Sequence, residues 1–331
     1  MKTLKSSLVA IITWMALPGF GAAIETISES FVGSAATIPG VQGAGERVSL
    51  FSLRAVRPAL YAGKVTSVNS TAIGDTGANW TAGLVTGRDA LYVEFANGVE
   101  ADIQQVNVSA KKISFLGPLP PSVITGLAYR IREHHTVAQI FGSANQAGLL
   151  AGANDATAET ILHYIPETQE TRTYYYLDFN GFNGWVQIDY SPASNVVIYP
   201  EQGLMVRRRS GGDITLTSSG PLKSWASTIT VFPGYNLLGL YNRATPLSLG
   251  NLNLPAVGFV AGANPDVADN VLKLNPDGTS TKYFYLNLIG FEGWYDFSYL
   301  PAGQVTLVPG TVFMLYRRAP AAAFDWTLPA Q

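Results

Sequence analysis

The chain has 331 residues, a formal net charge of −2, 47% hydrophobic side chains and 13% charged side chains. This length allows two domains of ordinary size, and the composition excludes a disordered chain. The small negative charge argues against nucleic acid and acidic membrane surfaces as partners, because it would not attract either. The 33 glycines and 19 prolines are typical of a turn-rich β protein. The sequence has no cysteine, which excludes disulfides and cysteine-ligated metals.

The first residues have the pattern of an export signal. Lys2 and Lys5 supply a positive start, residues 8–17 form an apolar stretch, and Gly21 and Ala23 are small residues suited to a cleavage site. We therefore predict that residues 1–23 are a signal peptide. The protein would then act in the periplasm, at the cell surface or outside the cell. The apolar stretch is too short for a membrane span, and no other segment is suited to one.

A run of short strands occupies residues 59–132. Turn residues separate stretches that alternate between apolar and polar side chains. The expected strands are Leu60–Asn69, Ala90–Phe95, Ile103–Val108, Lys112–Leu116 and Leu127–Arg132. Five short strands in about 75 residues indicate a small closed or half-closed β-barrel.

Residues 136–209 resemble residues 245–318, which indicates an internal repeat. We therefore predict an all-β fold with two tandem homologous modules, each like a β-sandwich or barrel. The first module comprises residues 24–58 and 133–222 and carries the small barrel as an insertion, and the second comprises residues 223–331. We interpret the arginines that end each unit as charged edge strands that resist aggregation. The matched segments are Thr136 with Thr245, Ala151-Gly-Ala-Asn154 with Ala261-Gly-Ala-Asn264, Met205 with Met314, and Arg208-Arg209 with Arg317-Arg318.

An aromatic β-hairpin is the clearest element of each unit. Strand formers of period two flank a short loop with two glycines, at residues 174–190 and again at residues 283–299. Alternation assigns one apolar side to the core in each copy. This predicted core side carries Tyr175, Leu177, Phe179, Val186, Ile188 and Tyr190, and then Phe284, Leu286, Leu288, Tyr295, Phe297 and Tyr299.

The opposite side of each hairpin is amphipathic and is the candidate ligand-binding face. Tyrosine and tryptophan rings can stack on sugar rings while carboxylates and amides bind sugar hydroxyls. The alternative is that a neighbouring sheet covers this face and makes it a second core side. The candidate residues are Tyr174, Tyr176, Asp178, Trp185, Gln187 and Asp189 in the first copy, and Tyr283, Tyr285, Trp294 and Asp296 in the second.

Four short motifs of the second unit support a resemblance. They are Gly234-Tyr-Asn-Leu-Leu-Gly-Leu, Tyr283-Phe-Tyr, Gly293-Trp and Leu307-Val-Pro-Gly310. The pattern resembles a β module common in secreted bacterial proteins, and the whole chain is similar to a family of exported β-rich proteins from environmental bacteria. The resemblance implies a β fold and export, and it implies no particular activity. Pro200-Glu201 departs from the expected Pro-Gly in the first unit.

Catalytic chemistry has little support in the sequence. The three histidines accompany no nucleophile motif, and His163 stands where the repeat has Lys273, which predicts a solvated position. Asp178 and Asp189 share a face, as two glycosidase acids would, but the second copy has Asn287 and Ser298 there. We assign no catalytic residue, no metal and no cofactor.

The sequence therefore favours an exported, non-enzymatic structural or adhesive protein of the cell surface or matrix. A carbohydrate-binding protein that uses the aromatic hairpin face is the alternative, and a polysaccharide hydrolase is less favoured. The expected partner is a glycan or another surface or matrix protein, with no nucleic acid and no membrane span. The oligomeric state stays open.

Overall fold

The fold is all-β, as the sequence predicts. The computed structural model describes residues 31–41, 45–88, 90–209, 211–241, 243–275 and 279–328. The predicted signal peptide lies outside the described residues. Helical structure within this part of the chain is confined to four short segments: α1 (Val137–Phe141), η1 (Ala82–Leu84), η2 (Leu249–Leu252) and η3 (Leu254–Val257). No helix in the described ranges is long and apolar enough to cross a membrane.

The first five-stranded sheet has the order β13-β12-β11-β15-β2, and all its neighbouring strands are antiparallel. Its strands are β2 (Arg47–Phe51), β11 (Thr160–Ile165), β12 (Glu170–Phe179), β13 (Phe182–Gln187) and β15 (Leu204–Arg208). Two ribbons accompany this sheet. They join β1 (Phe31–Ile38) to β16 (Ile214–Pro221), and β10 (His135–Thr136) to β14 (Val197–Ile198).

The second five-stranded sheet has the order β22-β21-β20-β24-β18, read from the edge that carries its aromatic hairpin. Its strands are β18 (Gly234–Gly239), β20 (Asn270–Leu274), β21 (Ser280–Leu288), β22 (Phe291–Asp296) and β24 (Val312–Arg317). Its ribbons join β17 (Ser227–Val231) to β25 (Phe324–Leu328), and β19 (Leu247–Ser248) to β23 (Thr306–Leu307). Each strand and ribbon takes the same place in chain order and in the sheet as its counterpart around the first sheet.

The pairing of β10 with β14 and of β19 with β23 changes one detail of the expected alignment, and the side-chain cap of Thr136 is not repeated at Ser248. Thr136 caps α1, because its hydroxyl accepts from the N–H of Gln139. Ser248 holds the equivalent place, at the end of β19 and directly before η2. The counterpart of Thr136 is therefore Ser248 rather than Thr245, because the strand pairing and not the residue identity fixes the alignment.

The predicted closed or half-closed small barrel is a seven-stranded sheet that does not close, so the closed alternative was wrong. Its order is β3-β9-β6-β7-β8-β5-β4, so β3 and β4 are edges that do not pair with each other. Only Val65 and Thr66 separate these two strands in the chain. The sheet is therefore strongly curved, because the end of one edge strand lies next to the start of the other. The strands are β3 (Tyr61–Lys64), β4 (Ser67–Asn69), β5 (Ala72–Gly74), β6 (Leu91–Phe95), β7 (Glu100–Asn107), β8 (Lys112–Phe115) and β9 (Ala128–Glu133).

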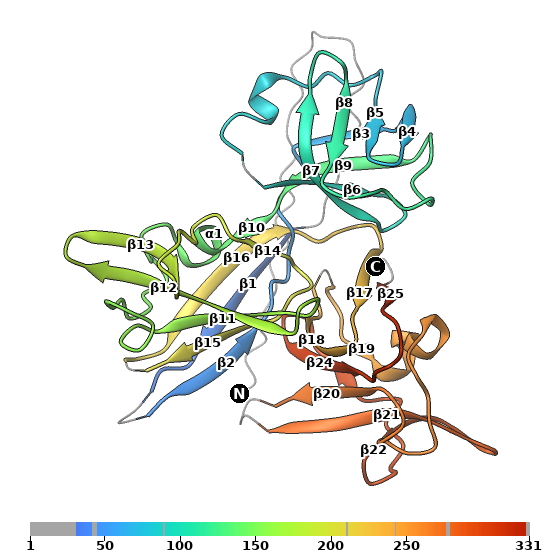
Figure 1. The fold of residues 1–331 in the computed structure, drawn as a ribbon. Helices are drawn as coiled ribbons and strands as arrows, with labels where there is room; N and C mark the ends of the chain where they lie inside the picture. Colours follow the sequence, from blue (N-terminus) through green and yellow to red (C-terminus); the bar gives the residue numbers. More distant parts are fainter. Residues whose placement is uncertain are drawn as a thin grey trace, which may run out of the picture.

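Buried side chains gather in three large clusters. One contains residues of the seven-stranded sheet alone, between Val65 and Ile131. Another lies within the first unit, between Ile38 and Leu216, and the third lies mainly in the second unit, with Val56 added from the first. Figure 1 shows the seven-stranded sheet at the top and the two five-stranded sheets below it, on opposite sides.

The two expected edge strands with arginines are interior strands. β15 lies between β11 and β2, and β24 lies between β20 and β18. Arg208 and Arg317 are buried and pair with the buried acids Glu159 and Asp269. The interpretation as solvated edges was wrong because the two arginines compensate buried carboxylates, a role that the local sequence does not reveal.

Candidate functional site

The aromatic face that the sequence offers as a ligand site is covered in both hairpins. Tyr174 is fully buried and Trp185 is 1% exposed. Tyr283 and Trp294 are buried in the same way, and Tyr176 and Tyr285 are half-buried. All four buried rings belong to the main cores of their units. These rings therefore offer no free surface to a sugar.

Neighbouring segments that precede each hairpin in the chain cover its rings. The Trp185 indole Nε1–H donates to the carbonyl of Gly142 at 2.7 Å, and its ring lies 5.7 Å from Phe141 at the end of α1. In the second unit the Trp294 ring lies 5.2 Å from Phe259. The chain after β10 covers the aromatic face in the first unit, and the chain after η3 covers it in the second. Alternation of residues in the sequence does not predict this cover.

The polar candidates on this face do not converge on one point. Asp178 and Asp189 are exposed and Gln187 is half-buried. Asp189 accepts hydrogen bonds from the hydroxyl and N–H of Ser191, and these bonds hold the pKa of its carboxyl below the usual range. Asp296 makes the corresponding turn in the second hairpin by accepting from the N–H groups of Ser298 and Leu300. These acids stabilise turns, which accounts for their presence without a ligand.

The predicted core side is exposed toward the end of each hairpin. Its inner residues are buried in small clusters that include Tyr175 and Phe284, but its outer residues face solvent. The reason is strand length. β12 continues beyond its last partner in β11, which pairs with Tyr175, and β21 continues beyond its last partner in β20, which pairs with Phe284. The outer parts of both hairpins therefore project past the sheet that would cover them.

Four equivalent positions in each hairpin carry exposed large apolar side chains. We call these sets hairpin surface one, which is Phe179, Phe182, Ile188 and Tyr190, and hairpin surface two, which is Leu288, Phe291, Phe297 and Tyr299. Phe179 is opposite Phe182 in the register, and Leu288 is opposite Phe291. Phe182 is 72% exposed and Phe291 is 63% exposed, which is unusual for rings of this size.

Both surfaces lie at the margins of their sheets. β13 and β22 are edge strands, so each hairpin has one outer strand with no further strand beside it. Figure 1 shows the β12–β13 hairpin extending to the left and the β21–β22 hairpin to the lower right, away from each other. Exposed acids flank both surfaces, with Asp178 and Asp189 at the first and Glu292 at the second.

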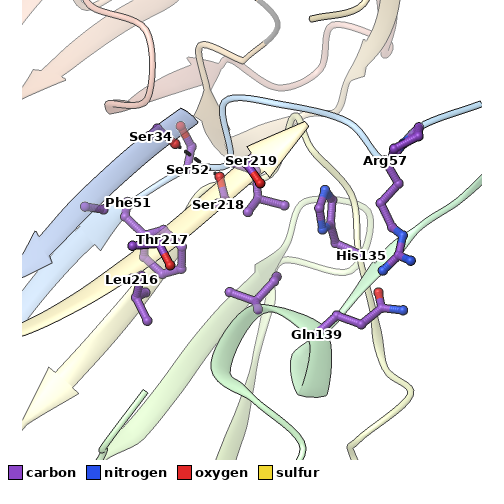
Figure 2. Close-up of a pocket in the computed structure, with 14 residues that line it drawn as sticks. Ser34, Phe51, Ser52, Arg57, His135, Gln139, Leu216, Thr217, Ser218 and Ser219 are labelled. Atoms are coloured by element: carbon purple, nitrogen blue, oxygen red, sulfur yellow. Dashed lines mark hydrogen bonds between the residues drawn. The ribbon is translucent and has the colours of Figure 1, made fainter. Parts of the chain in front are cut away.

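A hollow of about 350 Å³ lies beside the β1–β16 ribbon. Figure 2 shows the hydroxyls of Ser34 and Ser218 at one end, and Arg57, His135 and Gln139 at the other. Most of these groups have partners: Arg57 pairs with Glu133, His135 Nε2 is 3.1 Å from the carbonyl of Ala55, and the serines bond to each other. Burial lowers the pKa of His135 to about 4, so its ring is neutral and Nε2 donates to Ala55.

The three histidines have separate structural partners. His134 Nε2 lies 2.8 Å from Asp102, and His163 Nε2 lies 2.7 Å from the Gln202 side chain. His163 is 2% exposed, so the expectation of a solvated position was wrong. The comparison with Lys273 failed because the partner of the His163 ring is Gln202, which lies 39 positions further along the chain. The residues next to His163 in the sequence do not reveal that partner. Among the described residues no cluster of histidine and carboxylate side chains is suited to a metal ion.

Comparisons with protein-family models, with curated proteins and with solved structures found no match for this chain. The argument about function therefore rests on the surfaces and cavities of the molecule. Of these, the two hairpin surfaces are features that sequence reasoning missed. The signal in the sequence was the length of the first strand of each hairpin. β12 is longer than its neighbour β11, and β21 is longer than its neighbour β20.

Proposed function

We propose that this is a non-enzymatic structural protein, exported to the cell surface or matrix, whose copies join through the two hairpin surfaces. The single observation that supports this proposal is the exposure of large apolar residues at four equivalent positions in both hairpins. Large apolar residues exposed on a folded domain are candidate interaction sites. The sequence pattern of residues 1–23 supports export, and the surface or matrix location is part of the proposal.

We further propose that the two five-stranded units are tandem copies of one β module, and that residues 59–132 are an insertion in the first. The common order of strands and ribbons supports the duplication. A duplicated module explains why both hairpins have apolar side chains at the same four positions. It also means that any partner shaped to fit one hairpin surface would find a similar surface on the other.

The partner that suits these surfaces best is a second copy of the same chain. Their phenyl and aliphatic side chains favour a protein contact, whereas sugar platforms combine tyrosine or tryptophan with convergent polar groups. The flanking acids disfavour an anionic lipid surface.

Two surfaces on one chain lead to extended assembly rather than to a closed pair. Each copy can contact one neighbour through hairpin surface one and another through hairpin surface two. Because the hairpins project in different directions, such contacts continue from copy to copy unless a rotation closes them into a ring. A matrix or surface layer is built in this way.

The test is the mass of the purified protein, measured by light scattering over a range of concentrations. We expect the parent chain to form species larger than dimers as concentration rises. Phe182→Ser with Ile188→Ser removes hairpin surface one, and Phe291→Ser with Phe297→Ser removes hairpin surface two. Each of these two variants should stop at a dimer or below, and the variant with all four changes should be monomeric.

Val68→Ser and Leu116→Ser together form the matched control. They remove exposed apolar side chains of similar exposure from the seven-stranded sheet, and the control should assemble as the parent does. A parent chain that stays monomeric at all concentrations contradicts the proposal. Glycan binding by such a monomer, lost on Tyr190→Ala, would instead support a carbohydrate-binding protein that uses hairpin surface one.

A further inference from the structure

A cleft of about 450 Å³ lies where the three sheets meet. It is lined by β7, by the loop after β8, by the turn after β11, by the turn between β14 and β15, and by β17 and β18. This volume lies in the range of small-molecule sites. Four carboxyl groups line it, those of Glu100, Asp102, Glu167 and Glu201.

Two of these acids already have charged or polar partners. Glu100 pairs with the buried ammonium of Lys223. Asp102 accepts from the Tyr199 hydroxyl at 2.6 Å and lies 2.8 Å from His134 Nε2. These bonds to His134 and Tyr199 outweigh burial and hold the pKa of Asp102 below its usual range. Asp102 is therefore ionised at neutral pH.

Glu201 differs from the other acids of the cleft. Its Oε2 is buried, and no described residue forms a hydrogen bond with it. Burial, followed by the nearby charge of Glu100, raises the pKa of its carboxyl to about 8. Lys223 and Asp102 also act on this carboxyl, in opposite directions, and the hydroxyls of Tyr92, Tyr199 and Tyr241 lie within its field. At neutral pH the group is mostly protonated, and its buried Oε2 has no hydrogen-bond partner among the described residues.

The turn that carries Glu201 has a counterpart in the second unit. The N–H of Gln202 donates to the carbonyl of Tyr199, and the N–H of Thr311 donates to Val308 in the equivalent turn. Gly310 therefore takes the position of Glu201. A buried carboxyl oxygen without a hydrogen-bond partner is costly. Its presence at the cleft points to a ligand.

We propose that the cleft binds an aliphatic diamine or polyamine, with one ammonium group paired to Glu201. An ammonium supplies both the positive charge and the N–H donors that the buried Oε2 lacks. Apolar side chains between the acids, including Pro118, Pro166 and Leu238, suit the methylene segments of such a ligand. An extended cation fits better than a metal ion, because no three acids of the described chain come together to hold one.

Binding should release a proton. The protonated Glu201 carboxyl gives up its proton to solvent as the ligand's ammonium, already charged, takes its place beside the carboxylate. Charge in the cleft is then balanced by the ligand instead of by the proton. Affinity should rise with pH up to about 8, because less free energy is spent on removing the proton, and it should level off above that value.

The experiment is isothermal titration calorimetry of the full protein with spermidine at neutral pH, in phosphate and in Tris. The two buffers differ in their heat of protonation, so the difference in measured heat reports the protons released. We expect about one proton released per ligand bound. Glu201→Gln should weaken binding by about ten- to a hundredfold and should abolish the proton release.

Glu292→Gln is the control, since it removes an exposed acid far from the cleft and should leave both quantities unchanged. Thermal melts of all three proteins establish that each is folded, and Glu201→Gln should melt at or above the parent temperature because it removes a buried acid. Absence of spermidine binding by the parent contradicts the proposal. Equal proton release by the parent and Glu201→Gln would contradict it as well.

Discussion

The Nε atom of Arg208 lies 2.7 Å from Oε2 of Glu159, and both side chains are buried in the first five-stranded unit. Arg317 and Asp269 have the same relationship in the second unit, with Nη1 and Oδ2 2.7 Å apart. In each pair the acid also accepts from the backbone N–H of the residue after the arginine. The pair joins the end of an interior strand to the loop that precedes its neighbour.

Removing one partner of this pair should destabilise the fold strongly. Arg208→Ala leaves the Glu159 carboxylate buried without its charge partner, and we expect the free energy of unfolding to fall by about 3–5 kcal/mol. Urea unfolding measures the loss. Arg47→Ala is a matched control, because Arg47 is exposed and lies directly opposite Arg208 in the sheet. Equal losses in the two variants would contradict the structural role.

Trp185→Ala should also be destabilising, because the ring is covered. We expect a loss of about 3–5 kcal/mol through the cavity, with the hydrogen bond to Gly142 lost in addition. Phe182→Ala, three residues away and exposed, should change stability by less than about 0.5 kcal/mol. Thermal or urea unfolding of both variants measures the difference. A small loss of stability in Trp185→Ala would contradict the conclusion that the aromatic face is covered.

His163 should make stability sensitive to acid. Burial lowers its pKa to about 4 in the folded protein, against about 6.5 in the unfolded chain. The neutral ring is favoured by folding, so its contribution is complete above about pH 6.5 and is lost as the pH falls toward 4. The full loss is about 3 kcal/mol.

His163→Gln provides the comparison for this pH dependence. Glutamine retains a polar contact with Gln202 but takes up no proton in this range. Urea unfolding from about pH 7 to pH 4 should therefore give a flatter stability profile for the variant than for the parent. Parallel profiles for the two proteins would show that the acid sensitivity has another source, such as His135.

The seven-stranded sheet should fold on its own. Its buried cluster draws only on residues of this region, and its ends are close in space because the N–H of Leu60 donates to the carbonyl of Ile131 at 2.8 Å. We expect a fragment of residues 59–133 to unfold cooperatively in urea. Exchange of its buried amide hydrogens without protection would contradict an independent core.

The sequence by itself determined many of the strands and the pairing within each hairpin. The hairpin at residues 174–190 was predictable because alternation and turn residues act between neighbours in the chain. The expected strands Ala90–Phe95 and Leu127–Arg132 correspond closely to β6 and β9 for the same reason. Strands and turns depend mainly on residues that are close together in the sequence.

Only the tertiary structure decided which face of each hairpin is covered. Tyr174 and Phe182 lie on opposite faces, and alternation shows that they differ without showing which one another segment will cover. Phe141 and Gly142, which cover the rings, precede Trp185 by more than 40 positions. The same holds for Glu201, whose neighbours Glu100 and Lys223 come from other parts of the chain. Burial and charge depend on contacts between distant segments, and no local pattern of residues encodes those contacts.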